Sequence, residues 1–396
     1  MNIILFDAEQ RDHLLPITYT RPVADIRVGI LTIKEKWEKY LDTKASFLTI
    51  DYLQEKFPIN ISANNILING GLLPDNLIIE EIKQLKEKEA LTKDNQLLAI
   101  CLSEENITAF LDGSLDDYTN KEYDLDVEIL TRPWEIFSKN GEQIAEDYDL
   151  ITAGRKSQIL SKTVQTVGDY PIFLEEGAQI ECAIINTKEG PVYIGKDAEV
   201  MEAAVIRGPF ALCEHSTIKM AAKIYGDTTI GPHCKVGGEI SNSVFQGYAN
   251  KAHDGFLGNA VIGEWCNLGA DTNNSNLKNN YVEVALWNYP KGGFVKTGLQ
   301  FCGLIMGDHS KCGINTMFNT GTVVGVSANI FGSGFPRNFI PSFSWGGASG
   351  FKEYKTNKAY EVAEKVFARR DMVFDETEKK ILDTVFELSK DYRKGY

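Results

Sequence analysis

A period of six residues runs through much of this sequence, and it constrains the fold more than any other feature. Eight aliphatic residues stand six apart: Ile194, Val200, Ile206, Leu212, Ile218, Ile224, Ile230 and Val236. A second series has the same spacing: Met306, Cys312, Phe318, Val324 and Ile330. Neither an α-helix, with about 3.6 residues per turn, nor a lone strand gives this period. The hexads therefore predict a solenoid in which each coil of short strands buries its inward residues against the next.

Glycine directly follows several inward positions of the repeat. These glycines are Gly195, Gly231, Gly237, Gly263, Gly269, Gly307, Gly313 and Gly325. Because glycine adopts positive φ without steric cost, we expect tight turns with φ > 0 there. The repeat begins near Val164 and ends near Phe331, and it lapses over residues 270–304, which must leave the coil. Long excursions from a repeat usually form sites or subunit contacts.

The segments outside the repeat indicate two further regions. In residues 1–150, apolar runs predict strands, and segments of helical periodicity lie between them, as expected for an α/β unit. The strands are predicted at residues 2–6, 46–50, 65–70 and 97–102, helices around 30–41 and 78–85, and a loop over the acidic residues 112–126. A proline-initiated helix over 131–151 leads to the solenoid, and the chain after 353 is helical, with a capping box at Asp375 and Glu378. We divide the chain into 1–150, 151–350 and 351–396.

Charge and cysteine content exclude some classes of function. The net charge of −14 lies entirely in residues 1–150, which hold 15 Lys and Arg against 29 Asp and Glu. This argues against binding of nucleic acid, which requires a basic face, but not against small anions. No apolar run is long enough to span a membrane, and the start of the chain reads as a strand. The seven cysteines include no C-x-x-C pair, so we expect free thiols and a cytoplasmic protein.

The residues that carry chemistry are densest over 235–280. The chain reads Lys251-Ala-His253-Asp-Gly-Phe256, then Asn267-Leu-Gly-Ala270-Asp-Thr, then Ser-Asn276-Leu-Lys278, and Glu239 lies fourteen residues before His253. This stretch resembles the acetyltransferase half of the bifunctional GlmU family, which makes UDP-N-acetylglucosamine from glucosamine 1-phosphate, acetyl-CoA and a nucleotide. The resemblance implies a left-handed parallel β-helix, a homotrimer, and acyl-CoA sites between neighbouring coils.

The chemistry that the resemblance implies is physically sound. A sugar amine attacks the acetyl-CoA thioester only after losing a proton, and imidazole is suited to accept it near neutral pH. His253 is the candidate base, and Glu239 would orient the imidazole and stabilise its charged form. Asn267 and Asn276 would bind amide or sugar groups, and the Ala270 backbone would face the thioester. The cations Lys223, Lys251 and Lys278 would contact phosphate or CoA charges, and Phe256 would stack.

Some positions depart from the family pattern. Phe256 replaces a tyrosine, Ser241 replaces a lysine that binds the sugar phosphate, Asp271 replaces a glycine and Leu277 replaces a tyrosine. The identity of the acceptor sugar therefore stays open. Zinc chemistry of the γ-carbonic anhydrase type is another alternative, since His215 and His233 are eighteen residues apart and are expected to stack one coil apart. A third histidine at the short spacing of that family is missing, so we assign no metal ligand.

The N-terminal region resembles sugar nucleotidyltransferases less closely. The frame Leu-Pro16-Ile-Thr18-Tyr-Thr-Arg21-Pro22 follows the first strand, but the Gly-rich loop is replaced by Glu9-Gln10-Arg11-Asp12. Side chains of Arg11, Arg21 and Arg27 are candidates to bind nucleotide phosphates in place of that loop. Arg27 and Gly29 could equally form a turn at a helix start. Asn69 and Gly70 resemble the segment before the family's metal-binding Asp, but Gly71 stands at the Asp position, so Mg²⁺-dependent transfer is an open question.

The sequence thus favours an enzyme of sugar-nucleotide synthesis. Its N-terminal domain is a nucleotidyltransferase-like (Rossmann-type) α/β domain, followed by the β-helix and C-terminal helices. The substrates implied are a sugar phosphate, a nucleotide and acetyl-CoA. Two alternatives remain: a sugar-1-phosphate nucleotidyltransferase with a structural β-helix, and a binding or scaffold protein.

Overall fold

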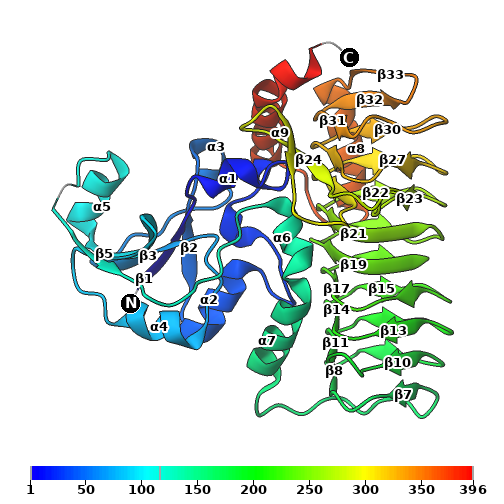
Figure 1. Cartoon of the computed structure of the whole chain (residues 1–396), viewed down its shortest axis with the longest axis horizontal. Coiled ribbons are helices and arrows are strands. Elements are labelled where there is room, and N and C mark those ends of the chain that lie inside the picture. The colour runs from blue at the N-terminus through cyan, green and yellow to red at the C-terminus, as the bar shows by residue number, and fades with distance from the viewer. Residues whose placement is uncertain (1, 116, 395–396) are drawn as a thin grey trace. The chain divides into compact units, whose positions relative to one another are not determined.

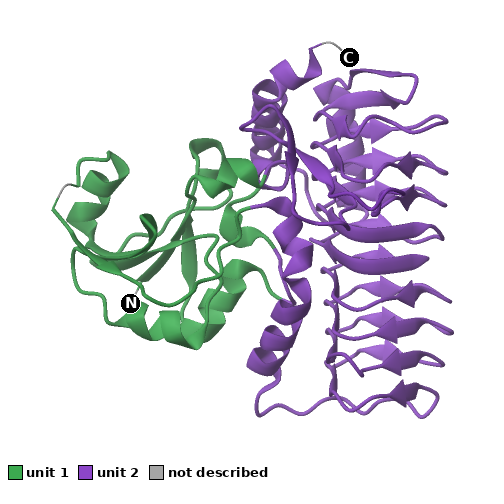
Figure 2. Cartoon of the chain, in the orientation of Figure 1, with its two compact units in different colours: residues 1–14, 21–26, 31–131 green, residues 15–20, 27–30, 132–396 purple. Residues whose placement is uncertain are grey.

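The computed structural model describes residues 2–115 and 117–394, which form two compact units (Figure 2). The first unit comprises Met1–Leu14, Arg21–Ile26 and Leu31–Thr131, and the second comprises Leu15–Thr20, Arg27–Ile30 and Arg132–Tyr396. Two short segments from the N-terminal part of the chain therefore belong to the second unit, together with residues 132–150.

The first unit is built on a six-stranded mixed sheet with the strand order β2-β1-β3-β5-β4-β6. Its strands are β1 (Asn2–Phe6), β2 (Ala45–Leu48), β3 (Asn64–Asn69), β4 (Glu89–Lys93), β5 (Gln96–Ser103) and β6 (Thr119–Glu122). The three strands β1, β2 and β3 are parallel, whereas β5 is antiparallel to β3 and β4. All four predicted strands are confirmed. The prediction of a loop over 112–126 was wrong at β6, an exposed edge strand whose polar sequence gives no apolar signal.

Two helices of the first unit begin at side-chain caps. The helices are α1 (Gln10–His13), α2 (Ile33–Leu41), α3 (Asp51–Gln54), α4 (Asn76–Lys83) and α5 (Glu104–Leu111). Thr32 and Glu35 form a reciprocal capping box at the start of α2. Asp75 accepts hydrogen bonds from two backbone N–H groups at the start of α4. Both predicted helices are therefore present, and their apolar residues Ile33, Trp37, Ile78 and Ile82 are buried.

The second unit contains the predicted parallel β-helix, whose coils stack in regular layers (Figure 1). Each coil has three faces. The first face holds β8 (Ile172–Leu174), β11 (Val192–Ile194), β14 (Phe210–Leu212), β17 (Thr228–Ile230), β26 (Leu304–Met306), β29 (Thr322–Val324) and β31 (Phe339–Ile340). The second holds β9 (Gln179–Ile180), β12 (Glu199–Val200), β15 (Thr217–Ile218), β18 (Lys235–Val236), β20 (Asn250–Lys251), β22 (Asn267–Leu268), β27 (Lys311–Cys312), β30 (Asn329–Ile330) and β32 (Ser344–Gly347).

The third face carries the candidate site. It holds β7 (Gln165–Val167), β10 (Ile184–Asn186), β13 (Val205–Arg207), β16 (Lys223–Ile224), β23 (Asn273–Asn274) and β28 (Met317–Phe318). Two longer strands, β19 (Glu239–Phe245) and β21 (Phe256–Ile262), run from the third face into the first. Their inward residues join one continuous core with those of the other coils. The coil continues past Phe331 to Gly347, beyond the end that the hexads indicated, because the last coil no longer keeps the spacing of six.

Glycines of the repeat serve a different purpose from the one expected. None of the eight adopts positive φ, so that prediction was wrong; the left-handed residue usually lies two positions further on, as at His233 (φ 58°) and Trp265 (φ 60°). A Cβ on Gly231 would lie 2.3 Å from the carbonyl oxygens of Phe245 and Gln246 in the next coil. Glycine is required here because adjacent coils approach too closely for a side chain.

Other segments of the second unit flank the coils. Helix α6 (Pro133–Ser138) begins with the predicted proline, and α7 (Asn140–Thr152) follows it along the β-helix (Figure 1). The predicted excursion from the coil is present but begins later than residue 270, since β23 still pairs with β28 of the next coil. It contains a hairpin of β24 (Ala285–Asn288) and β25 (Gly293–Lys296). At the C-terminus, α8 (Thr356–Ala368) and α9 (Glu376–Leu388) are followed by the 3-10 helix η3 (Lys390–Arg393). Asp375 caps α9 by accepting a hydrogen bond from the Glu378 N–H.

Two composition-based expectations concern the whole chain. All seven cysteines are free thiols, and those of the repeat, Cys234 and Cys312, are buried in its core as small apolar residues. Within residues 2–115 and 117–394, none of the helices has the length and hydrophobicity that a membrane span requires.

Candidate functional site

His253 lies at the turn between the second and third faces of the β-helix, and its side chain is exposed. The turn stacks between the corresponding turns of the preceding and following coils. Its Gly255 carbonyl accepts a hydrogen bond from the Glu239 N–H of the preceding coil at 3.2 Å, and its Asp254 carbonyl accepts one from the Asp271 N–H of the following coil at 3.0 Å. We call this stack of turns, residues 237–239, 252–255 and 269–272, the His253 corner. The predicted base is thus presented at the surface of the coil, where a substrate can reach it.

The third face presents Glu239 beside two other predicted residues. The ladder places Lys223, Glu239 and Phe256 side by side on three successive coils. Lys223 Nζ lies 3.7 Å from Glu239 Oε2, in a pair that is partly open to solvent. Among residues 2–115 and 117–394, Glu239 makes this ion pair and no hydrogen bond to the His253 ring. The carboxylate adjoins the turn of His253 but does not orient its imidazole.

Lys251 lies inside the coil, although we expected it to contact phosphate or CoA. It is only 1% exposed and occupies the inward position that Val236 fills one coil earlier. Its Nζ donates to the carbonyls of Gly237 and His253 at 3.2 and 2.8 Å, and to that of Asp254 at 3.4 Å. Burial lowers the pKa of this ammonium to about 8. Lys251 therefore fixes the backbone of the His253 corner and does not face a ligand.

The remaining predicted residues of the acetyltransferase half divide into two groups. Asn267 lies on the second face and accepts a hydrogen bond from Asn250 at 3.0 Å, while Ala270 lies in the His253 corner. Asn276 lies at the opposite end of the third face and donates to Asn259 at 2.8 Å. Lys278 lies further along the same segment, where its Nζ donates to the Glu283 carbonyl. The third face thus connects the two groups.

A cavity of about 650 Å³ opens at that opposite end of the third face. Its lining includes Arg207 and Tyr225, which precede Ser241 on successive coils, together with Asn242 and Asn259. Sequence reasoning missed Arg207 and Tyr225, although both stand one position after an inward hexad residue, which places them on the outer surface. Ser241, which replaces the family's lysine, is therefore accompanied by an arginine from the same face.

The histidine pair His215 and His233 is stacked one coil apart, as predicted, but not as a metal site. The two rings are nearly parallel, with centroids 4.9 Å apart, and the stack continues through Tyr248 and Trp265. Rings stacked face to face do not direct two nitrogens at one ion. In the described parts of the chain, no group of three His, Cys, Asp or Glu residues could hold a metal. The zinc alternative is not supported.

In the first unit, polar side chains gather where β1 and β3 end. Ligands of α/β folds usually bind at the carboxyl ends of parallel strands. The site lies where the chain leaves two adjacent strands toward opposite sides of the sheet. Asn69, the last residue of β3, accepts hydrogen bonds from Gln10 and from the Gly71 N–H. A Cβ on Gly70 would lie 3.1 Å from the Phe6 carbonyl, so Gly70 allows the two strand ends to approach.

Asp7, directly after β1, is the residue at this edge that sequence reasoning missed. It accepts hydrogen bonds from the Val23 N–H and the Thr49 hydroxyl, and its Oδ2 lies 3.4 Å from Arg11 Nε. Burial raises the pKa of Asp7. Arg11, predicted to bind nucleotide phosphate, also donates to the Tyr52 hydroxyl at 3.1 Å. The available signal was a carboxylate immediately after the first strand.

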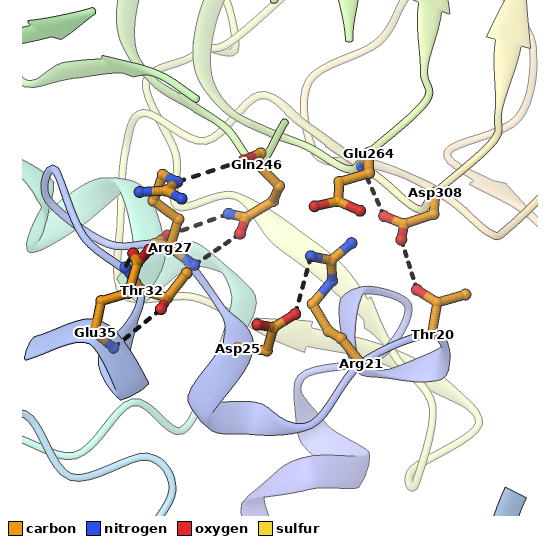
Figure 3. A network of polar contacts seen from close by, with 9 residues as sticks. All are labelled: Thr20, Arg21, Asp25, Arg27, Thr32, Glu35, Gln246, Glu264 and Asp308. Atoms are coloured by element: carbon orange, nitrogen blue, oxygen red, sulfur yellow. Dashed lines mark hydrogen bonds and ion pairs between the residues drawn. The ribbon is translucent and has the colours of Figure 1, made fainter. Parts of the chain in front are cut away.

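The other two predicted arginines occupy different units. Arg21 belongs to the first unit, is 3% exposed and lies 3.7 Å from Asp25. Arg27 belongs to the second unit, where its backbone N–H donates to the Gln246 side chain at 2.7 Å (Figure 3). Its guanidinium donates to the Ile30 carbonyl. The Ile30 N–H in turn donates to Asp147 of α7. The Arg27–Ile30 segment thus attaches to the β-helix and α7.

Mg²⁺ is the ion that nucleotidyl transfer implies, so its fit can be tested on these residues. Both Asp7 oxygens already accept hydrogen bonds, and Gly71 offers no side chain where the family has its Asp. Hard divalent cations need open carboxylate oxygens. The residues at this edge do not form a divalent-metal site in this structure.

The fold and these sites define a class: an α/β nucleotidyltransferase-like unit joined to a hexapeptide β-helix. Residues 3–156 match the sugar nucleotidyl transferase family. The chain is 28% identical over 277 residues to a bifunctional protein GlmU of Methanocaldococcus jannaschii, covering 69% of this chain and 57% of the relative. It is 29% identical over 145 residues to a bifunctional sugar-1-phosphate nucleotidylyltransferase/acetyltransferase of Sulfurisphaera tokodaii, covering 36% of each.

An uncharacterized acetyltransferase, YaiX of Escherichia coli, is 27% identical over 153 residues, or 38% of this chain and 66% of the relative. The chain thus covers less than two thirds of the length of these curated relatives. With the fold and the motifs around His253, these matches show that the chain is similar to bifunctional GlmU proteins and to sugar nucleotidyl transferases.

Proposed function

We propose that this protein is an enzyme of sugar-nucleotide biosynthesis that N-acetylates an amino-sugar 1-phosphate with acetyl-CoA. The observation that carries the proposal is the His253 corner, which presents an exposed imidazole next to the Glu239 face of the β-helix. The names of the relatives, which include acetyltransferase and bifunctional nucleotidylyltransferase, support this reaction class. We take the product to be of the UDP-N-acetylglucosamine type.

The imidazole would act as a proton carrier in this reaction. The sugar ammonium gives a proton to His253 Nδ1 or Nε2, and the free amine attacks the thioester carbonyl. The nitrogen of the tetrahedral intermediate loses its second proton to solvent, the intermediate collapses with cleavage of the carbon–sulfur bond, and the imidazolium returns a proton to the departing CoA thiolate. Glu239 stabilises the positive charge near the amine through the field of its carboxylate rather than through a bond to the imidazole.

Cations on the third face suit the acceptor phosphate. Lys223 is exposed beside Glu239, and Arg207 lines the cavity at the other end of the face. A guanidinium binds a phosphate through two parallel hydrogen bonds, which an ammonium cannot do. Arg207 therefore takes the role that a lysine at position 241 would fill. Asn276 and Asn259 offer amide groups to sugar hydroxyls in the same region.

Nucleotidyl transfer by the first unit is the second activity that we propose. The support is the match of residues 3–156 to sugar nucleotidyl transferases and the polar edge formed by Asp7, Gln10 and Asn69. The nucleotide would bind at the carboxyl ends of β1 and β3. The side chains at this edge are bonded to one another, and we assign no metal ion to them.

We also propose a cytoplasmic homotrimer with acetyl-CoA bound between neighbouring coils. The outer surface of the third face and its turns exposes apolar side chains, which a second copy would cover. These residues are Val167, Ile184, Val205, Met220, Tyr225, Ile314 and Met317. Free thiols throughout the chain suit a reducing compartment.

The test is release of free CoA thiol from acetyl-CoA in the presence of glucosamine 1-phosphate and other amino-sugar phosphates. Wild-type protein is expected to release thiol with at least one acceptor and to lose this in His253→Ala. If thiol release is absent with every acceptor while pyrophosphate forms from UTP and a sugar phosphate, the protein is a nucleotidyltransferase with a structural β-helix. If neither product forms, it is a binding or scaffold protein.

A further inference from the structure

The corner between the second and third faces of the β-helix is filled differently at His253 than in other coils. Behind the turn in other coils lies one small buried side chain: Ala204 and Ala222 in earlier coils, and Thr272 and Thr316 in later ones. In the two coils between them this position is held by Gly238 and Gly255, whose carbonyls accept the same ladder hydrogen bond as that of Ala222. The space behind the His253 turn therefore receives no side chain from the corner position itself.

The turn that precedes the His253 turn in this stack is also shortened. In the coil before it, the inward residues of the second and third faces are six positions apart, at Ile218 and Ile224. In the shortened coil they are only four apart, at Val236 and Ile240. Two fewer residues and two glycines leave room inside the corner for a long side chain.

The side chain of Lys251 occupies that room. Its Nζ donates to the carbonyls of Gly237, His253 and Asp254 at 3.2, 2.8 and 3.4 Å. An ammonium has three donors and no acceptor, so three carbonyls match it. In the later coils the hydroxyls of Thr272 and Thr316 have the corresponding task, since they donate to the carbonyls of Gly269 and Gly313 at 2.7 and 2.8 Å. Lys251 thus replaces a corner threonine with a longer, charged donor.

The Lys251 ammonium is charged at neutral pH. Burial lowers its pKa to about 8, and the neighbouring side chains of Asp254, Cys312 and Asp271 oppose this shift. Hydrogen bonds from a charged donor are roughly twice as strong as those between neutral groups. A buried carbonyl that loses such a donor is left unpaired, which is costly, so the turn would have to move to find a new partner.

From these contacts we infer that Lys251 is a positioning residue for the candidate base. It holds the backbone of the His253 turn, so that the imidazole keeps one orientation toward the bound amine. The carbonyl that receives its shortest hydrogen bond belongs to His253 itself. A displacement of about 1 Å in an active site can cost a factor of 10² in rate. That Lys251 serves acetyl transfer rests on the proposed function, whereas its hold on the turn does not.

Lys311 offers a matched control in the same β-helix. Its Nζ donates to the carbonyls of Trp265 and His309 at 3.4 and 2.8 Å, and burial lowers its pKa to about 8. These carbonyls belong to turns between the first and second faces and not to the His253 corner. Lys251→Met and Lys311→Met each remove a desolvated ammonium and its backbone bonds, but only the first affects the His253 turn.

The kinetic test is thiol release by the full chain. Lys251→Met is expected to lower kcat by about tenfold to a hundredfold, with KM for acetyl-CoA and for the acceptor changed by less than about twofold. Lys311→Met should change kcat by less than about twofold. In a His253→Ala background, Lys251→Met should lower the residual rate by less than about twofold, because no imidazole is left to position.

Hydrogen exchange measures the hold on the turn without any substrate. The amides of Glu239 and Asp271, which donate to the His253 turn, should exchange at least about fivefold faster in Lys251→Met than in wild type or Lys311→Met. Methionine is apolar and fills irregular gaps, so the variant is expected to fold. Lys251→Gln, which keeps a shorter amide donor, serves the same measurements if the methionine variant does not fold.

The outcomes separate a positioning role from a general one. Unchanged exchange at the His253 corner in Lys251→Met overturns the inference. An equal fall of kcat in Lys311→Met also overturns it, as does a full multiplication of the two effects in the double variant, since both indicate a general loss of structure. Faster exchange in a protein that releases no thiol with any acceptor would reject acetyl transfer, and Lys251 would then hold the turn without serving a base.

Discussion

The two units of the chain use their polar candidate residues in opposite ways. In the first unit, the polar groups at the end of the sheet already have partners. Arg11 pairs with Asp7 and donates to Tyr52, and Asn69 accepts a hydrogen bond from the Gly71 N–H. In the β-helix unit, His253 is exposed at a turn whose backbone is fixed by other residues. A polar group with internal partners contributes mainly to stability, whereas one held in place with its own atoms free can act on a substrate. The comparison therefore places the stronger case for catalysis in the β-helix.

Removal of the His253 imidazole is expected to have the largest effect on activity. His253→Ala should lower acetyl transfer by about 10² to 10⁴, the usual contribution of a positioned acid–base group. The melting temperature should hardly change, because the side chain is exposed. The measurement is thiol release at saturating acetyl-CoA, with His215→Ala as a matched control from the stacked pair. Equal activity in both variants would mean that His253 is not the base.

Arg11 offers the contrasting case, in which stability rather than ligand binding should suffer. Arg11→Met removes the cation beside Asp7 and a donor to Tyr52. Because Asp7 stays buried, we expect a loss of about 2–3 kcal/mol in the free energy of unfolding. Urea denaturation followed by circular dichroism measures this loss. A stable variant that no longer binds UTP would show that Arg11 belongs to a phosphate site, as the sequence suggested.

Lys251 shows that the contrast also holds within the β-helix. Its ammonium is buried, and burial lowers its pKa from 10.5 to about 8. Between these values the unfolded chain binds more protons at this site than the folded chain, so its contribution to stability rises with pH. We expect the unfolding free energy of wild type, relative to Lys251→Met, to increase by on the order of 2 kcal/mol from pH 8 to 10.

Parallel urea titrations of both proteins at several pH values provide the measurement, with Lys352→Met as an exposed control that should show no such trend. A difference between wild type and Lys251→Met that stays constant with pH would indicate that the ammonium is solvated in the folded state.

Sequence alone predicted the β-helix because a period of six has no other common source. It could not reveal why glycine follows the inward residues, because the approach of Gly231 to the Phe245 carbonyl depends on the distance between coils. The spacing of Glu239 and His253 correctly placed both near one turn. Spacing does not encode side-chain rotamers, so it could not show that Glu239 pairs with Lys223 and makes no bond to His253. Nor could it show that Lys251 points inward, because the coil from Val236 to Lys251 is shorter than the regular repeat.

The smallest expected effect concerns Glu239. This carboxylate has one partner, Lys223, but is still partly exposed, so it is intermediate between the fully bonded groups of the first unit and the exposed His253. Glu239→Gln removes its ion pair with Lys223, and because the pair is partly exposed, stability should change by less than about 1 kcal/mol. Activity should fall by roughly fivefold to tenfold, since the carboxylate acts on charge near the amine through space and not through the imidazole. A pH profile of kcat/KM for thiol release distinguishes this role from orientation of the ring. If Glu239 did orient His253, the variant would lose activity to the same extent as His253→Ala, and the two residues would act as one unit.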